Sequence, residues 1–191
     1  MAKLEELKSQ LLPLVKKLAC IKLAEPVKLS SGKMSSVYFD GRKVTLHPEG
    51  VTLFARAILE LVGPDSIDAV GGPSIGADPI ATAVSVVAYL EKNKKIPAFL
   101  IRKETKQHGL QKQIEGAELK SGMKVLIVED VITTGGSVLN AILEVEKLGA
   151  KIVKVVCLVD RGEGAETLLA PYNYSPLFTL ADFKNSPFPP L

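Results

Sequence analysis

The sequence is poor in the residues that build zinc sites and disulfide frameworks. It has only two cysteines and two histidines in 191 residues, namely Cys20, Cys157, His47 and His108. The two cysteines lie far apart in apolar stretches, and no Cys-x-x-Cys pair is present. A structural zinc site usually takes about four closely spaced ligands, so the sequence argues against one. We expect two buried structural thiols in a reducing compartment rather than a disulfide or a nucleophile.

A strong excess of charge of one sign and a long apolar run are absent too. The formal net charge is +3, from 24 basic and 21 acidic residues that are mixed along the chain, apart from a basic segment at 102–112. This balance argues against a nucleic-acid partner. Residues 1–17 carry charges throughout, which argues against a signal peptide and a membrane span. We expect a soluble, cytoplasmic protein with neither nucleic acid nor membrane as a partner.

Hydrophobic periodicity indicates an α/β fold. Leucines at helical spacing in residues 4–18 predict an amphipathic helix with a kink or restart near Pro13. Short strands and turns are expected over 27–45, and a second helix over 50–62. Strands then alternate with helices, which implies βαβ units and a largely parallel sheet covered on both faces. The predicted strands are 66–72, 96–102, 123–130 and 151–161, and the predicted helices are 75–92 and 135–150.

One connection in this alternation is unusually long and polar. It runs from Lys103 to Gly122, after the predicted strand at 96–102. Loops of this length inside compact domains are commonly functional. Because the segment follows an apolar strand, we expect it to act as a lid.

The stretch VLIVEDVITTGGS, residues 125–137, places two carboxylates at the end of an apolar strand and a Gly-rich turn after them. In open parallel sheets, ligands bind beyond the carboxyl ends of the strands. Glycines let backbone N–H groups crowd around a phosphate, hydroxyls add donors, and a helix N-terminus favours an anion. The turn is not a Walker A loop, because the spacing differs and no lysine follows the glycines.

One ligand can satisfy both the acidic and the Gly-rich part of this stretch. Glu129 and Asp130 can accept hydrogen bonds from vicinal hydroxyls, and the turn at 133–137 can hold a monophosphate. A sugar 5-phosphate offers both groups, a ribose diol at one end and a phosphate at the other. The alternative is a strand end with solvated acids, followed by an N-capped helix.

The stretch closely resembles the diphosphoribosyl-binding motif of the type I phosphoribosyltransferase family. The shared pattern is four hydrophobic residues, Glu-Asp, two hydrophobic residues and Thr-Thr-Gly-Gly-Ser. The resemblance implies a central, mainly parallel sheet flanked by helices, with a small N-terminal hood. It implies a single domain, 1–191, with helix and hood at 1–48 and a core at 49–183 that carries a mobile loop, 103–116. Within the motif, the implied ligands of 5-phosphoribosyl 1-diphosphate are Glu129, Asp130, Val131, Ile132, Thr133, Thr134, Gly135, Gly136 and Ser137.

Three further segments resemble the orotate branch of this family, the orotate phosphoribosyltransferases. RKETKQHG, residues 102–109, resembles the catalytic-loop signature, which hypoxanthine-type relatives lack. Residues 29–50 resemble the N-terminal substrate-binding segment. VDRGEG, residues 159–164, resembles the Asp-Arg that follows the next strand of the core. The resemblance extends in the family's order over 4–183.

The reaction implied by the resemblance is displacement of pyrophosphate from 5-phosphoribosyl 1-diphosphate by N1 of orotate, in pyrimidine synthesis. Negative charge develops on the leaving pyrophosphate, so Mg²⁺ and fixed cations would stabilise it. We expect Mg²⁺ to be held mainly by the substrate, with Asp130 as the candidate protein ligand. The implied catalytic residues are Lys103, Lys106, His108 and Asp130, and Arg102, Lys103, Lys106 and His108 are implied to bind the sugar diphosphate.

Several roles stay open. In the family the loop at 103–116 reaches the active site of the neighbouring subunit, which implies a homodimer; the alternative is a solvated charged connector. His108 is either an acid toward pyrophosphate or a simple donor, and His47 either caps a helix or contacts ligand. Tyr38 and Phe39 either form a wall beside the base or belong to the core.

The implied orotate site consists of Lys33, Thr133 and Arg161. A guanidinium pairs bidentately with a planar carboxylate, which makes Arg161 the candidate for the carboxylate of orotate. The alternative for Arg161 is a surface salt bridge with Asp160 or Glu163.

Two lysines of the family are missing. Ser30 stands at the first lysine position, with Lys33 close by, and Gly76 stands at the second, in the loop after the first core strand. The backbone from Gly71 to Gly76 can still cradle pyrophosphate through N–H groups. These departures leave two alternatives open: another type I phosphoribosyltransferase that uses a purine or uracil, and a non-catalytic regulator that senses the sugar diphosphate.

Overall fold

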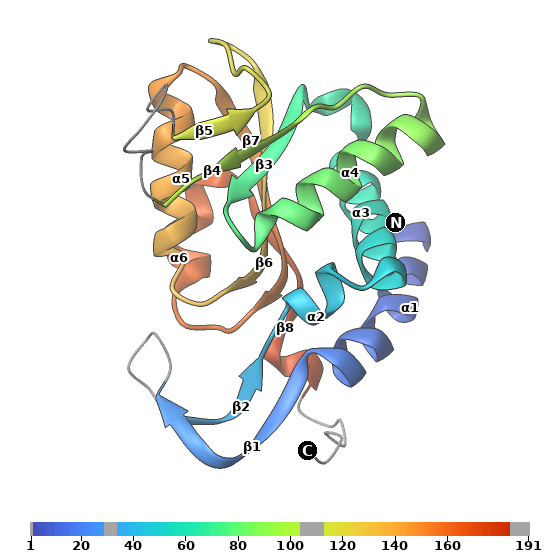
Figure 1. Cartoon of the computed structure of the whole chain (residues 1–191), viewed down its shortest axis with the longest axis vertical. Coiled ribbons are helices and arrows are strands. Elements are labelled where there is room, and N and C mark those ends of the chain that lie inside the picture. The colour runs from blue at the N-terminus through green and yellow to red at the C-terminus, as the bar shows by residue number, and fades with distance from the viewer. Residues whose placement is uncertain (1, 29–33, 104–112, 184–191) are drawn as a thin grey trace.

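The core of the molecule is a sheet of six strands, β3 (Ala69–Pro73), β4 (Ala98–Ile101), β5 (Ile114–Gly116), β6 (Lys124–Ile132), β7 (Lys151–Asp160) and β8 (Tyr174–Thr179). The computed structural model in Figure 1 describes residues 2–28, 34–103 and 113–183. The strands lie in the order β5-β4-β3-β6-β7-β8, and every neighbouring pair is parallel except β4 and β5. The predicted α/β fold with a mainly parallel central sheet is confirmed.

Helices cover both faces of this sheet (Figure 1). On one face lie α3 (Pro48–Val62) and α4 (Ala77–Lys92), with α1 (Ala2–Leu18) packed against α3; on the other lie α5 (Gly136–Lys147) and α6 (Ala165–Leu169). The side chains of successive residues in β6 point to alternate faces of the sheet. Leu126 belongs to the cluster around α3 and α4, and Ile127 to the cluster around α5. Double burial explains the unbroken apolar run of this strand.

The first helix differs from its prediction. It runs without a break from Ala2 to Leu18 with Pro13 inside, so the predicted restart was wrong. Proline removes one backbone donor and crowds the preceding turn. Leu7, Leu11 and Val15 are buried on one side of this helix. Packing of that apolar side stabilises the helix across the proline, as tertiary packing commonly outweighs local propensity.

The C-terminal edge of the sheet was not predicted. β8 contains Pro176, which lowers strand propensity, but a proline is tolerated on an edge strand, where one side of the backbone has no partner strand. α6 is too short to show helical periodicity. Three 3₁₀ turns complete the described elements, η1 (Pro64–Ser66), η2 (Ala170–Tyr172) and η3 (Leu180–Phe183).

The N-terminal strands form a small sheet of their own. β1 (Cys20–Lys28) and β2 (Met34–Phe39) pair antiparallel, with Cys20 opposite Phe39, and extend away from the core at the bottom of Figure 1. The short helix α2 (Arg42–Thr45) leads from β2 back to the core. Phe39 is buried at the base of this hairpin, with its ring edge-on to Phe183 at a centroid distance of 5.5 Å. The hairpin therefore meets the core beside the end of β2.

The long polar segment is part loop and part strand. Its residues 114–116, which the sequence assigned to the loop 103–116, form β5 and pair with β4. Arg102 N–H donates to the Gln113 carbonyl at 2.9 Å, and the Gln113 side-chain amide donates to the Arg102 carbonyl at 3.1 Å. The two ends of the loop are thus held together. The predicted roles of Lys106 and His108 fall on residues outside the described ranges.

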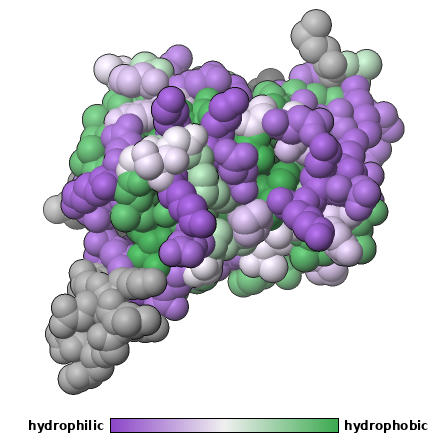
Figure 2. Space-filling view, turned by 90° about the horizontal axis from the view of Figure 1, so that it is seen from above, coloured by the Kyte–Doolittle hydropathy of each residue, from purple (hydrophilic) through white to green (hydrophobic). Residues whose placement is uncertain are grey.

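Both cysteines are buried and free, as predicted. Within the described ranges, none of the helices combines the length and the apolar character needed to cross a bilayer. Figure 2 shows hydrophilic side chains interspersed with apolar ones over the face seen there, an ordinary pattern for a protein surface.

Candidate active site

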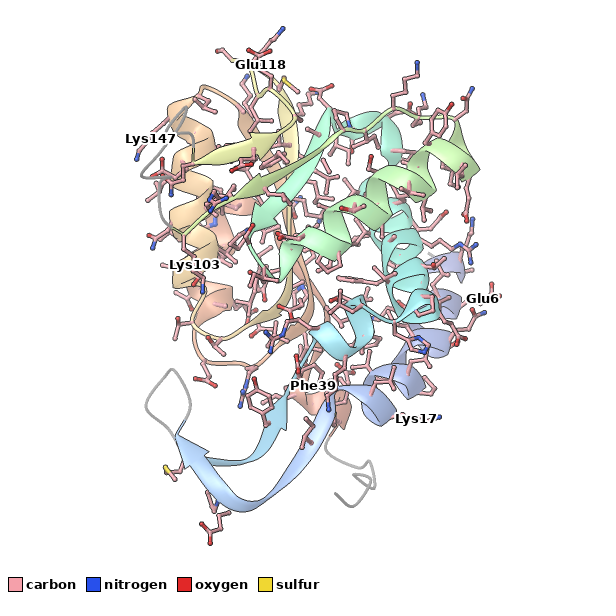
Figure 3. The ribbon with its side chains drawn as sticks, in the orientation of Figure 1. Glu6, Lys17, Phe39, Lys103, Glu118 and Lys147 are labelled. Atoms are coloured by element: carbon pink, nitrogen blue, oxygen red, sulfur yellow. The ribbon has the colours of Figure 1, made fainter. Side chains whose placement is uncertain are left out.

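A cavity of about 810 Å³ opens at the carboxyl ends of β3, β4 and β6. Its lining includes the end of β3 and the turn after it, Arg102 and Lys103 after β4, and the whole stretch from Glu129 to Val138. Tyr38, Phe39 and residues 40–42 approach from the hairpin side. Figure 3 labels Lys103, which follows β4, and Phe39, at the end of β2; both residues line the cavity. Segments far apart in the chain therefore meet where parallel sheets bind ligands.

The two adjacent carboxylates are held by their own backbone. Glu129 Oε1 accepts from the Asp130 N–H at 3.0 Å, and Asp130 Oδ1 accepts from the Val131 N–H at 2.8 Å. Glu129 is only 9% exposed. Burial is the main cause that raises the pKa of Glu129 well above its usual range, and the neighbouring charge of Asp130 adds to it. The pair is fixed in place before any ligand arrives, and one member resists ionisation.

Two glycines seat against this pair from opposite sides. A Cβ added to Gly76 would collide with Glu129 Oε1 and lie 2.6 Å from Asp130 Oδ1. A Cβ added to Gly41 would lie 2.9 Å from Asp130 Oδ2. Both distances are shorter than real Cβ contacts, so neither position admits a side chain without movement. A side chain at Gly76 would therefore require the carboxylate ends of Glu129 and Asp130 to move.

The Gly-rich turn leads into α5 without a side-chain cap. Gly135 is the N-cap residue in the left-handed region, at φ +86°, and no side chain bonds the first N–H groups of this helix. The first N–H groups of any helix lack partners within the helix and carry partial positive charge. Thr133, Thr134 and Ser137 also line the cavity and add hydroxyl donors. This turn can therefore hold a phosphate, and the predicted alternative of an N-capped helix is wrong for α5.

Three cations line the described part of the cavity. Arg102 Nη1 donates to Glu115 Oε1 at 3.1 Å. Lys103 is exposed. Burial contributes most to the raised pKa of Glu129, and the positive charge of Lys103 acts in the opposite direction and lowers it. Arg42 Nε donates to Asp40 Oδ1 at 3.0 Å. The sequence predicted Arg102 and Lys103 but not Arg42.

Arg161 does not line the cavity. It lies at the end of β7, and its backbone N–H donates to the Ile132 carbonyl at 2.9 Å. Its Nε is 3.6 Å from Glu163 Oε1, and the two side chains are 9% and 8% exposed. Asp160 instead accepts from the Gly162 N–H at 2.7 Å. The alternative partner Glu163 is therefore found, although the pair is buried rather than on the surface, and the orotate role of Arg161 stays a prediction.

The remaining candidates divide between cavity, core and helix cap. Tyr38 and Phe39 both line the cavity, and Phe39 also packs in the core. His47 Nδ1 accepts from the Gly50 N–H at 3.4 Å and caps α3, so the capping role is the one observed. Lys33 lies outside the described residues, and Thr133 lies in the cavity lining.

Sequence reasoning placed Asp40 to Arg42 within the substrate-binding segment at 29–50 and Ser74 within the backbone cradle at 71–76, but it singled out none of these residues and missed Asp78; all of them line the cavity. Ser74 Oγ donates to Asp78 Oδ1 at 2.9 Å. The sequence signals for the first segment are its position within residues 29–50 and its place directly after the Tyr-Phe pair. A short polar run after a strand is too common to identify a site.

Comparison with known proteins agrees with this geometry. A family model described as a phosphoribosyl transferase domain matches residues 44–186. The orotate phosphoribosyltransferase of Nostoc sp. is 44% identical over 158 residues, which are 82% of this chain and 76% of the relative. The solved orotate phosphoribosyltransferase of Mycobacterium tuberculosis has a TM-score of 0.78 at 37% identity, and covers 93% of this chain and 99% of that chain. A structure of the same enzyme in complex with 5-phospho-alpha-D-ribosyl 1-diphosphate has a TM-score of 0.74 at 35% identity, with 92% and 98% covered.

The likenesses to the relative and to the two solved structures span 82–93% of the chain, and the family model covers the core sheet. They confirm the type I phosphoribosyltransferase fold expected from the motif at 125–137. The family model identifies a phosphoribosyl transferase domain, and the relative and the solved structures named above are orotate phosphoribosyltransferases. The chain belongs to the phosphoribosyl transferase family and, within it, to the orotate phosphoribosyltransferases.

Proposed function

We propose that the cavity binds 5-phosphoribosyl 1-diphosphate and orotate and joins them into orotidine 5′-phosphate, a step of pyrimidine biosynthesis. One observation carries the proposal: the fixed carboxylate pair Glu129–Asp130 shares a cavity with the uncapped N-terminus of α5. A ribose 5-phosphate has hydroxyls for the first and a phosphate for the second. The ribose would then lie between the carboxylate pair and the N-terminus of α5.

In the proposed reaction, the bond from C1 to the diphosphate oxygen breaks and the bond from C1 to N1 of orotate forms. The electron pair of the broken bond leaves with pyrophosphate, and the proton of N1 passes to solvent. Positive charge on the ribose at this stage would be favoured by the carboxylate of Asp130, and Arg102 and Lys103, which also line the cavity, would stabilise the departing negative charge. Such charge complementarity acts most strongly in a site from which water is excluded.

We propose Mg²⁺ as the cofactor. The cavity lining is rich in carboxylate oxygens, the ligand type that Mg²⁺ prefers. Among the described residues, however, no group of three or more potential ligands is placed to hold a metal ion by itself. The donor set therefore fits an ion that arrives with the diphosphate, with Asp130 as the protein ligand. When bound, Mg²⁺ would neutralise part of the charge of the leaving group.

The loop at 103–116 and the homodimer belong to the same proposal. Lys106 and His108 would contact pyrophosphate from the neighbouring subunit, as the resemblance implies. The pairing of Arg102 with Gln113 supports this, because it gives the loop a fixed base from which to extend. The single domain 1–191, with a hood at 1–48 and a core at 49–183, is proposed on the same ground.

The orotate end of the site is proposed to involve Lys33, Thr133 and Arg161. Thr133 lies in the cavity lining. The backbone N–H of Arg161 donates to the carbonyl of Ile132, the residue before Thr133, so the Arg161 backbone lies beside the cavity lining. We also propose a cytoplasmic location. Two buried free thiols suit a reducing compartment.

The test is a turnover assay with Mg²⁺ and 5-phosphoribosyl 1-diphosphate, with orotate, uracil and hypoxanthine in parallel. We expect loss of the ultraviolet absorbance of orotate and no reaction of the other two bases. Asp130→Asn should abolish most turnover, and Asp65→Asn, on the exposed turn η1, should not. Reaction of uracil or hypoxanthine alone would indicate another phosphoribosyltransferase. Tight binding of the sugar diphosphate without turnover would indicate a sensor.

A further inference from the structure

One wall of the cavity, the turn after β3, offers no cation of its own. The turn after β3 contributes Pro73, Ser74, Ile75, Gly76 and Asp78 to the lining. Its one charged member, Asp78, is acidic, and Gly76 has no room for a side chain beside Glu129 and Asp130. Any cation on this side must come from another segment.

The charged residues of the described lining show how few cations the cavity offers to a diphosphate. The acidic members are Asp40, Asp78, Glu115, Glu129 and Asp130, and the basic members are Arg42, Arg102 and Lys103. Arg102 is already bonded to Glu115. A diphosphate would enter a cavity in which fixed carboxylates outnumber cations, so each cation in reach has a large effect on its affinity.

Arg42 comes from the segment that seats on the other side of Asp130. Gly76 faces Asp130 Oδ1 and Gly41 faces Asp130 Oδ2, so a single carboxylate separates the turn after β3 from the segment that carries Arg42. The contact at Gly41 is too close for a side chain, so the backbone just before Arg42 packs directly against Asp130. Arg42 is therefore anchored at the edge of the carboxylate pair.

Asp40 orients this side chain. Its Oδ1 accepts from Arg42 Nε at 3.0 Å and lies 3.3 Å from the Arg42 backbone N–H. The hydrogen bond with Asp40, and to a smaller degree the charge of Asp130, raise the pKa of Arg42. Among the described residues, none bonds the two terminal Nη groups of Arg42. A guanidinium held by its Nε edge presents these groups as a fork that matches two phosphate oxygens.

We propose that Arg42 binds the diphosphate of 5-phosphoribosyl 1-diphosphate and supplies the cation that the turn after β3 lacks, with Asp40 as its positioning residue. This inference rests on the proposed function of the cavity. Arg42 belongs to the chain's own cavity rather than to the loop at 103–116, so it acts on substrate binding even before that loop engages. Its pairing with Asp40 is half-exposed, and exposed ion pairs contribute little to stability. A purely structural role would therefore leave substrate affinity unchanged.

The test compares Arg42→Gln, Arg42→Lys and Asp40→Asn with the wild type by steady-state kinetics and by calorimetric binding of 5-phosphoribosyl 1-diphosphate. Arg42→Gln should raise the KM and the Kd for this substrate by about 10- to 100-fold, the effect of one charge-assisted hydrogen bond. The KM for orotate and the melting temperature should stay nearly constant. Arg42→Lys should restore part of the affinity, and Asp40→Asn should lose less than Arg42→Gln.

Arg56→Gln is the matched control. Arg56 is a comparably exposed arginine on α3 that pairs with Glu91 and lies outside the cavity lining. An unchanged Kd for the sugar diphosphate in Arg42→Gln would overturn the inference, as would a rise confined to the KM for orotate. Turnover of the wild type in the same assay distinguishes failure of the proposed function from failure of the inference about Arg42. If the wild type consumes no orotate, the proposed function fails; if it does and Arg42→Gln behaves like Arg56→Gln, only the inference about Arg42 fails.

Discussion

Arg161 and Glu163 form an ion pair that is almost wholly withdrawn from solvent, with 3.6 Å between Nε and Oε1. Arg161 Nε and Glu163 Oε2 have no hydrogen-bond partner among the described residues. A buried pair of this kind contributes little net stability, but the loss of one partner leaves an uncompensated charge. The pair is therefore sensitive to change on either side.

We expect Glu163→Gln to lower the free energy of unfolding by about 3 kcal/mol, because the Arg161 charge then lacks its counter-ion. Urea denaturation measures this loss. If Arg161 binds the carboxylate of orotate, saturating orotate should stabilise Glu163→Gln more than the wild type. Equal stabilisation of both proteins by orotate would contradict the proposed role of Arg161. Glu166→Gln, on the exposed side of α6, serves as the control.

Glu129→Gln should stabilise the protein at pH 8. Burial raises the pKa of Glu129 in the folded state, so the folded protein holds a proton that the unfolded chain releases. Stability then falls as the pH rises from the ordinary glutamate range through the raised pKa, and the neutral amide removes this loss. A gain of about 1 kcal/mol would raise the melting temperature by about 2–4 °C. A gain at pH 5 as large as that at pH 8 would contradict this cause.

Gly76→Ala should impair catalysis without unfolding the protein. The new Cβ displaces the carboxylates of Glu129 and Asp130 or the turn that carries it. A misplacement of about 1 Å at a reacting centre costs on the order of 100-fold in rate. We expect kcat/KM for both substrates to fall by about that factor, with circular dichroism unchanged. Kinetics equal to those of the wild type would show that the turn after β3 accommodates the new Cβ without displacing the carboxylates of Glu129 and Asp130.

Lys106→Ala should depress the rate far more than the binding of the sugar diphosphate. A residue that reaches the leaving group from a loop acts mainly on the transition state, and loss of one such donor costs about 100- to 1,000-fold in kcat. Single-turnover kinetics and calorimetry separate the two effects. Equal losses in rate and binding would argue against a lid. Lys151→Ala, at the exposed start of β7, is the control.

Neither cysteine should react with a thiol reagent in the native protein. Burial raises the pKa of Cys20 to about 11 and raises that of Cys157 further. The thiolate is the reactive form, so both residues stay inert near neutral pH. Labelling in native and denaturing buffer should give two modified cysteines only after unfolding. Fast native labelling of Cys157 would mean that the sheet opens around β7.

Much of the fold was accessible from the sequence because the core elements carry strong periodic signals. The apolar run of β6 and the amphipathic pattern of α5 were identified almost to their ends. The strand β8 and the strand character of residues 114–116 were not, since both depend on neighbours that the chain meets only after folding. The uninterrupted α1 around Pro13 has the same explanation, because burial against α3 outweighs a local penalty.

The candidate site divides in the same way. The sequence by itself determined the chemistry of residues 129–137, since a carboxylate pair and a Gly-rich turn must stand together when only two residues separate them. Only the tertiary structure decided which distant segments complete the cavity: it brought Gly41 and Gly76 against opposite sides of Asp130, Arg42 into the lining, and Arg161 into a buried pair with Glu163. Local spacing fixes what neighbours in the chain can do together. Contacts between remote segments arise from packing, and packing depends on the shape of the whole fold.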